Sequence, residues 1–219
     1  MSFSPRIVVF DLDVTLTRYD TFLPFIVGYL RHHRKRRSVW LWKLPVALLK
    51  FWRWGDRTWL KTEMLRAFIG GEPRARVAQW TERFVDDLLD EAMREQGLAQ
   101  LRDFQSRGVR VILASASFDI YVERIAEKLD IGEVLATRAA WNSRGRLVGL
   151  DGENCRHEEK LRRVKALPDM PEDGAGVAAY SDSHADLPLL SWAEHGVAVW
   201  PSKRLFHQVG GLGLDVVRW

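Results

Sequence analysis

RIVVFDLD, residues 6–13, is a short apolar run that contains two aspartates at its end. This pattern is typical of a buried strand in a parallel sheet. Similar runs follow at 108–115, 176–183, 196–200 and 214–219, and stretches with helical spacing of apolar residues lie between them, at 118–129 and 157–167. The alternation predicts an α/β fold, a Rossmann-like, mostly parallel sheet with helices on both faces.

Two segments depart from this alternation. Residues 18–106 have helical periodicity almost throughout, which predicts a helical insert directly after the first strand. Residues 133–152 predict a hairpin with its turn around 142–145. We therefore expect a Rossmann-like core formed by 1–17 and 107–219, and a helical domain formed by 18–106.

The composition, 47% hydrophobic and 28% charged residues, is that of a globular protein. The single cysteine, Cys155, excludes a disulfide-built secreted scaffold and a zinc site made of several cysteines. The first residues lack the basic stretch followed by an apolar stretch that marks a signal peptide, so we expect a cytoplasmic protein.

Positive charge is concentrated in one part of the insert. The chain has 33 basic and 29 acidic residues, a net charge of +4, whereas residues 31–66 alone hold 11 basic and 2 acidic residues. Five of the ten tryptophans lie in the same segment. This asymmetry predicts an anionic partner surface, either a membrane or a nucleic acid.

Polar side chains follow three of the predicted strands, at the edge where ligands bind in such sheets. They are Asp11, Asp13 and Thr15, then Ser115 and Ser117, and then Asp182 and Asp186, while Lys160 lies on the helix before the third of these strands. Four carboxylates that converge would repel each other without a cation, and oxygen ligands favour Mg²⁺. A lysine and a hydroxyl nearby suit a phosphate dianion.

These residues resemble the four-part signature of the haloacid dehalogenase superfamily of phosphatases. The four parts are FDLDVTLT (10–17), LAS (113–115), a lone lysine and SDSHAD (181–186). The insert is similar to the cap of the phosphoserine-phosphatase-like branch. The resemblance implies a Mg²⁺-dependent phosphomonoesterase that works through an aspartyl-phosphate intermediate.

The resemblance also implies a role for each residue. Asp11 would be the nucleophile and Asp13 the general acid and base. Ser115 and Lys160 would bind the transferred phosphoryl group, and Thr15 would support the loop at the substrate site. The implied Mg²⁺ ligands are Asp11, the main-chain carbonyl of Asp13, Asp182 and, directly or through water, Asp186.

Three further residues bear on the site. Val14 and His157 stand where the family usually has glycine, and a β-branched residue such as Val14 restricts the backbone. Asp20 is predicted either to face a substrate amine, as an acid does in phosphoserine phosphatases, or to cap the helix that follows.

VWLWKLPVALLKFWRW, residues 39–54, has the composition of a helix that lies in a membrane interface, although its uncharged runs are too short to span a bilayer. Its apolar content favours lipid over nucleic acid, so we expect no nucleic-acid partner; alternatively, its tryptophans pack inside the insert. The basic, apolar insert and the motif YSDSHADLPLL (180–190) resemble bacterial phosphatidylglycerophosphate phosphatases. This resemblance implies a lipid phosphate as substrate and an anionic membrane surface as partner.

Two other functions stay open at this point. One is a soluble phosphatase for a small amine or amino-acid phosphate such as phosphoserine. The other is a non-catalytic binding module with the same fold, which the intact set of Asp11, Asp13, Lys160 and Asp182 disfavours.

Overall fold

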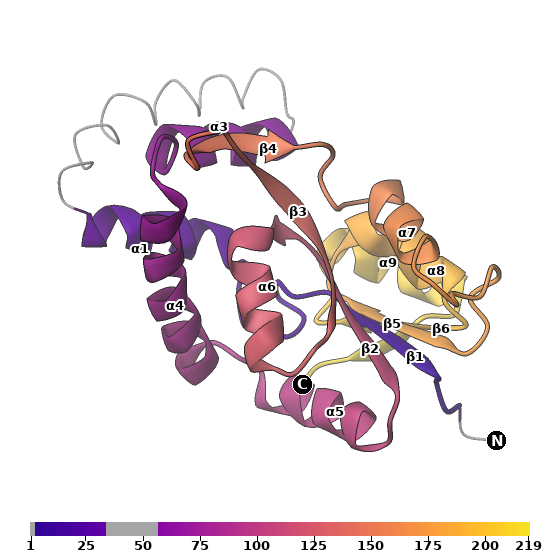
Figure 1. Ribbon diagram of the computed structural model, residues 1–219. Coiled ribbons are helices and arrows are strands. Elements are labelled where there is room, and N and C mark those ends of the chain that lie inside the picture. Colours follow the sequence, from indigo (N-terminus) through magenta and orange to yellow (C-terminus); the bar gives the residue numbers. More distant parts are fainter. Residues whose placement is uncertain (1–2, 34–56) are drawn as a thin grey trace.

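The computed structural model describes residues 3–33 and 57–219. Within them, a seven-stranded sheet has the order β4-β3-β2-β1-β5-β6-β7 (Figure 1). The strands are β1 (Ile7–Phe10), β2 (Arg110–Phe118), β3 (Glu133–Trp141), β4 (Leu147–Asp151), β5 (Val177–Ser181), β6 (His195–Val199) and β7 (Asp215–Val217). Neighbouring strands pair in parallel except β3 and β4, which form the predicted antiparallel hairpin. The predicted α/β fold is confirmed.

β1 is the central strand, and all four of its residues are buried. Val8 and Phe10 belong to one hydrophobic core, whereas Ile7 and Val9 belong to another. The two sets differ because successive side chains of a strand point to opposite faces of the sheet. Burial of β1 on both faces explains why its residues are apolar throughout. Asp11 follows directly after the strand.

Helices cover both faces of the sheet (Figure 1). The first core includes residues of α5 (Glu95–Ser106) and α6 (Asp119–Lys128). The second includes residues of α7 (Glu158–Lys165), α8 (Leu187–Trp192) and α9 (Lys203–Leu212), and the short helix η2 (His184–Asp186) precedes α8.

The described helices of the insert are α1 (Phe22–His32), α3 (Arg57–Phe68) and α4 (Arg74–Glu91). They are held to the core by aromatic and charged contacts. The ring centres of Phe25 in α1 and Tyr121 in α6 are 4.7 Å apart, and Nη2 of Arg124 in α6 lies 2.8 Å from Oε2 of Glu82 in α4. α5, the last helix of the segment 18–106, packs against β2. The division of the chain at residues 17 and 107 stays a prediction.

β2 is longer at its end than the sequence indicates. The strand expected at 108–115 continues to Phe118 and includes Ser117. Its pairing with β3 shifts register between Ala114 and Phe118, so the irregular part of the strand carries both serines of this segment.

The segment 39–54 lies outside the described residues, so its interfacial location stays a prediction. Within the described ranges, every helix is too short or too polar to traverse a lipid bilayer.

Candidate active site

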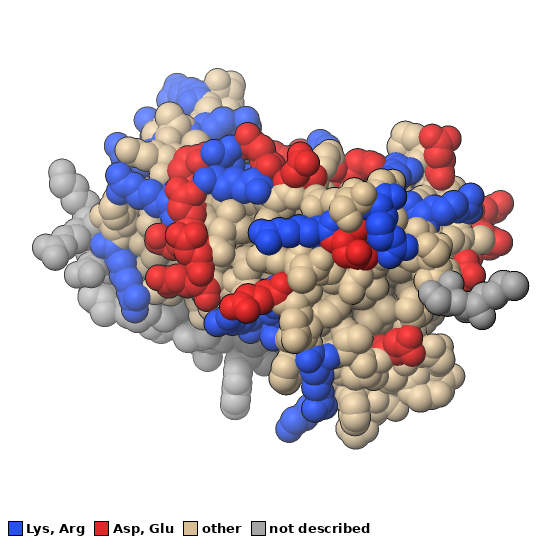
Figure 2. Space-filling view, turned by 90° about the horizontal axis from the view of Figure 1, so that it is seen from below, with Lys and Arg blue, Asp and Glu red and all other residues tan. Residues whose placement is uncertain are grey.

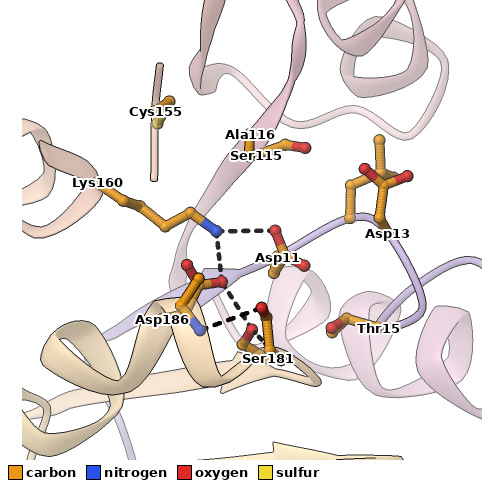
Figure 3. A network of polar contacts seen from close by, with 12 residues as sticks. Asp11, Asp13, Thr15, Ser115, Ala116, Cys155, Lys160, Ser181 and Asp186 are labelled. Atoms are coloured by element: carbon orange, nitrogen blue, oxygen red, sulfur yellow. Dashed lines mark hydrogen bonds and ion pairs between the residues drawn. The ribbon is translucent and has the colours of Figure 1, made fainter. Parts of the chain in front are cut away.

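A buried lysine joins two acids from separate loops (Figure 3). Lys160 Nζ, on α7, donates hydrogen bonds to Asp11 Oδ1 at 2.9 Å and to Asp186 Oδ2 at 2.5 Å. Ser181 Oγ, at the end of β5, donates to the same Asp186 oxygen at 2.7 Å. Lys160 and Asp186 are each 1% exposed, and Asp11 is 5% exposed. Three of the predicted residues therefore form one buried ion-paired network.

Asp13 is held by two hydroxyl side chains that the sequence did not assign to this role. Thr21 donates to Asp13 Oδ1 from its backbone N at 2.7 Å and from its Oγ1 at 2.6 Å. Ser117 Oγ donates to Asp13 Oδ2 at 2.5 Å. The hydroxyl of the buried Tyr121 lies 3.2 Å from Thr21 Oγ1. These bonds fix the orientation of the carboxylate, and they come from the start of α1 and from β2.

Thr15 and Ser115 are both fully buried. Thr15 Oγ1 accepts a hydrogen bond from the backbone N of Asp182 at 3.0 Å, so it joins the loop after β1 to the loop after β5. Ser115 Oγ accepts one from the backbone N of Ser117 at 3.0 Å.

A cavity of about 260 Å³ lies beside the loops that follow β1 and β5. Of the predicted site residues, it is lined by Asp11, Asp13, Asp20, Lys160, Asp182 and Asp186. Thr15 and Ser115 are not among its lining residues. The cavity therefore presents carboxylates from the loops after β1 and β5, together with the ammonium group of Lys160.

Four polar residues of the cavity wall were not among the predicted site residues. They are Ser183, in the loop after β5, Lys61 of α3 and, from the loop between β4 and α7, Asn154 and Arg156. Nothing in the sequence separates Lys61 from the other basic residues of its helix. Arg156 stands four positions before Lys160, and this proximity was the one available signal.

Burial and like charges perturb the acids of the cavity. Burial raises the pKa of Asp11 to about 7; Lys160 lowers it, and Asp186 and Asp13 raise it. Burial, followed by the charges of Asp11 and Asp186, raises the pKa of Asp182 to about 8. Burial opposes the charged form of Lys160, but Asp11 and Asp186 outweigh it and raise the pKa of Lys160 well above its usual range. The lysine therefore stays charged, and two of the acids lack enough positive charge nearby.

A family model described as haloacid dehalogenase-like hydrolase matches residues 8–191. The chain belongs to this family. Protein CicA of Caulobacter vibrioides is 29% identical over 205 residues, which cover 93% of this chain and 90% of CicA. As a member of the family, the chain is a hydrolase.

Solved structures share the fold of this haloacid dehalogenase-like hydrolase. A protein of unknown function from Bordetella pertussis Tohama I has a TM-score of 0.81 at 22% identity, and the match covers 98% of each chain. A phosphoserine phosphatase, solved as an analogue of its phospho-aspartyl intermediate, has a TM-score of 0.63 at 18% identity, covering 97% of this chain and 92% of the other. At these identities, the likeness shows a shared fold.

The two residues that replace the family's usual glycines adopt the backbone conformations that favour glycine. Val14 has φ of 62° and His157 has φ of 54° with ψ of −134°. Residues held in such conformations cost on the order of 1–3 kcal/mol each. The loop after β1 and the start of α7 are therefore strained at these two residues, and the surrounding contacts must hold the strain.

Asp20 contacts the start of α1, as one of its two predicted roles requires, while its facing a substrate amine stays a prediction. Its Oδ1 accepts a hydrogen bond from the backbone N of Phe22 at 3.0 Å, at the start of α1. It also lines the cavity. The carboxylate is therefore tied to the helix and still faces the space that a substrate would fill.

The donor atoms of the site fit the Mg²⁺ that the family implies. Asp186 Oδ1 is buried with no hydrogen-bond partner among the described residues. Burial, together with neighbouring acids, raises the pKa of Asp11 and of Asp182, so further positive charge is needed to keep both ionised. A hard cation with oxygen ligands would supply both needs. Within residues 3–33 and 57–219, no three His, Cys, Asp or Glu side chains are grouped as a ready ligand set. The fit therefore rests on the carboxylates of Asp11 and Asp182, the carbonyl of Asp13 and, directly or through water, the unpartnered Oδ1 of Asp186.

Proposed function

We propose that this haloacid dehalogenase-like hydrolase cleaves phosphate monoesters through a phosphorylated Asp11. The observation that supports it most is the position of Asp11. Its carboxylate is buried at the carboxyl end of the central strand, is held by Lys160 and borders the cavity. Asp13 lines the same cavity, and Thr21 and Ser117 hold it in one orientation.

The reaction has two steps. In the first, an Asp11 oxygen bonds to phosphorus, the ester P–O bond breaks, and the leaving alkoxide takes a proton from Asp13. In the second, the oxygen of a water molecule attacks phosphorus while Asp13 takes a proton from that water, and the bond between phosphorus and Asp11 breaks. Inorganic phosphate leaves, and both carboxyl groups return to their starting states.

Lys160 contributes electrostatically. Its ammonium group fixes Asp11 and offers positive charge to the phosphoryl oxygens in the transition state. Mg²⁺, held by Asp11, Asp182 and the Asp13 carbonyl, would neutralise further phosphoryl charge when bound.

The test is hydrolysis of an aryl phosphate with Mg²⁺ by the wild type and by Asp11→Asn. The variant should retain the fold and lose all turnover, because an amide cannot form the phosphorylated intermediate. Asp87→Asn, on the exposed face of α4, is the matched control and should hydrolyse normally. Turnover by Asp11→Asn above a few per cent of wild type, in preparations free of other phosphatases, would contradict the proposal.

For the substrate, we propose a lipid phosphate such as phosphatidylglycerophosphate, cleaved at an anionic membrane surface. Support comes from the 11 basic and 2 acidic residues in 31–66 and from the position of Lys61, which belongs to this segment and lines the cavity. Most of the segment lies outside the described residues. The face in Figure 2 mixes acidic and basic side chains, so the described residues seen there form no uniformly basic surface.

A small amine phosphate such as phosphoserine is the second candidate, favoured by the carboxylate of Asp20 at the cavity wall. The two candidate substrates should depend on different residues of the cavity wall. If the substrate is a lipid phosphate in anionic vesicles, Lys61→Gln should lower kcat/KM more than Asp20→Asn does. If phosphoserine is the better substrate and Asp20→Asn has the larger effect, the lipid proposal is wrong.

A further inference from the structure

The loop that joins Asp11 and Asp13 to α1 is held by two side chains that do not line the cavity. Arg94 Nε donates to the backbone oxygens of Val14 and Thr17, both at 3.1 Å. Trp219 Nε1 donates to the backbone oxygen of Thr15 at 3.1 Å. Three of the four carbonyl groups in 14–17 therefore accept hydrogen bonds from these two side chains.

The two side chains also support each other. Arg94 Nη1 donates to the backbone oxygen of Trp219 at 3.2 Å, and the guanidinium lies 5.1 Å from the centre of the Trp200 ring. The indole of Trp219 stacks on Tyr180 of β5 with ring centres 5.6 Å apart. A Cβ at Gly97 would lie only 3.1 Å from Trp219 Nε1, so the absence of a side chain at Gly97 makes room for the indole.

The backbone places Arg94 beside this loop. Residues 16–18, which precede α1, and residues 92–94, which join α4 to α5, run antiparallel through a bridge between Thr17 and Met93. The backbone N of Arg94 donates to the oxygen of Leu16 at 2.8 Å, and that of Arg18 donates to the oxygen of Ala92 at 2.8 Å. Arg94 is therefore anchored by its own backbone to the loop that its side chain contacts.

The strain in this loop explains why such support matters. Val14 is β-branched and has φ of 62°, a conformation that side chains with a branched Cβ disfavour. Val14 lies directly after Asp13, and Thr15 contacts the backbone of Asp182. A relaxed Val14 would turn the Asp13 carboxylate and would shift the neighbouring contact to the loop after β5.

We propose that Arg94 and Trp219 are positioning residues that hold 14–17 in the strained conformation and thereby aim Asp13 at the leaving group. The proposal rests on the proposed phosphatase function. Neither side chain touches substrate; both act through the backbone of the loop. The loop needs these two side chains because Val14 is strained in its conformation. A glycine at position 14 should therefore make the loop less dependent on Arg94 and Trp219.

The test is a double-mutant cycle between Arg94→Met and Val14→Gly. It is read by kcat and KM on an aryl phosphate and by hydrogen exchange of the amides in 12–17. Arg94→Met should lower kcat about tenfold or more at a nearly unchanged KM and should speed amide exchange in 12–17, because the loop leaves the strained conformation. In the Val14→Gly background, the same substitution should lower kcat no more than about threefold.

Further variants separate positioning from folding. Trp219→Phe keeps an aromatic ring stacked on Tyr180 and removes the Nε1 donor. It should therefore speed amide exchange in 12–17, but less than Arg94→Met does. Arg94→Lys keeps the charge but cannot make both Nε contacts, so it should resemble Arg94→Met. Arg102→Met, exposed on α5, is the control and should match wild type in both measurements.

The proposal is wrong if Arg94→Met keeps kcat and exchange within twofold of wild type, or if its effect has the same size in both backgrounds. If wild type does not hydrolyse the aryl phosphate, the proposed function fails, and exchange in 12–17 alone decides whether Arg94 and Trp219 hold the loop. Should Arg94→Met fail to fold, Arg94→Lys and Trp219→Phe decide by the same criteria.

Discussion

Lys160→Met removes the only cation that is ion-paired to Asp11 or Asp186 among the described residues. Both acids are at most 5% exposed, so water solvates their charge only weakly once the ammonium group is lost. Removing one partner of a buried ion pair costs about 3–5 kcal/mol, because it leaves an uncompensated buried charge. Methionine has a similar length and leaves no large cavity. We therefore expect the free energy of unfolding in EDTA at pH 8 to fall by about 3–5 kcal/mol.

The difference in the free energy of unfolding between wild type and Lys160→Met should become smaller as the pH is lowered. Protonated carboxyl groups no longer need a cation, and the pKa of Asp11 is already raised to about 7 by burial. Urea unfolding of wild type and Lys160→Met at pH 8 and at pH 5.5 measures this difference. On an aryl phosphate with Mg²⁺, kcat should fall by about 100-fold or more, as when a charge-stabilising donor is removed from other active sites.

Lys165→Met is the matched control, since Lys165 is exposed on the same helix. It should change the free energy of unfolding by no more than about 0.5 kcal/mol and leave kcat unchanged. The reasoning is refuted if Lys160→Met unfolds at the same urea concentration as wild type at pH 8, or if it keeps a tenth or more of the wild-type kcat.

Three further outcomes follow from the site. Thr21→Val and Ser117→Ala should each lower kcat about tenfold or more, with Tm nearly unchanged, because each removes a hydroxyl donor that orients Asp13, the proposed general acid; steady-state kinetics with a melting curve checks this, and normal kcat in both would oppose it. Folded Asp11 and Asp182 have raised pKa values, so between about pH 4 and pH 8 the native state holds protons that the unfolded state has lost. Stability in EDTA should therefore fall as the pH rises through this range, and Mg²⁺ should raise Tm more at pH 8 than at pH 6; an equal gain at both values would contradict it. Val14→Gly should raise the free energy of unfolding by about 1 kcal/mol through relief of strain, measured by urea unfolding, and a loss of stability would show that the valine is not strained.

The sheet and the charged residues at its edge were predictable from the sequence for a simple reason. A strand buried on both faces, such as β1, must be apolar throughout, and parallel strands bring their carboxyl ends to one edge. Asp11 and Asp186 lie far apart in the chain, yet that rule places them together. Lys160, on α7, was expected beside them from the family resemblance, and the structure joins the three residues by hydrogen bonds.

The residues that orient the catalytic groups were not predictable in the same way. Thr21 and Ser117 hold Asp13, but single hydroxyl residues near a helix start or a strand end have no periodic pattern. The contacts of Arg94 depend on how residues 92–94 return from the insert and pair with 16–18, which is a tertiary feature. Val14 also shows a limit, because the sequence indicated a restricted backbone at this residue but not the left-handed conformation that the structure has there.

The central claim is that Asp11 carries the phosphoryl group, and mass spectrometry of acid-quenched enzyme tests it most directly. Enzyme mixed with Mg²⁺ and an aryl phosphate, then quenched in acid within the first turnover, should yield a peptide containing Asp11 that is heavier by one phosphoryl group. Hydroxylamine should remove this group, as expected for an acyl phosphate. The peptide from Asp11→Asn should stay unmodified. Phosphate on another residue, or release of product with no modified peptide at any time in the first turnover, would contradict the account.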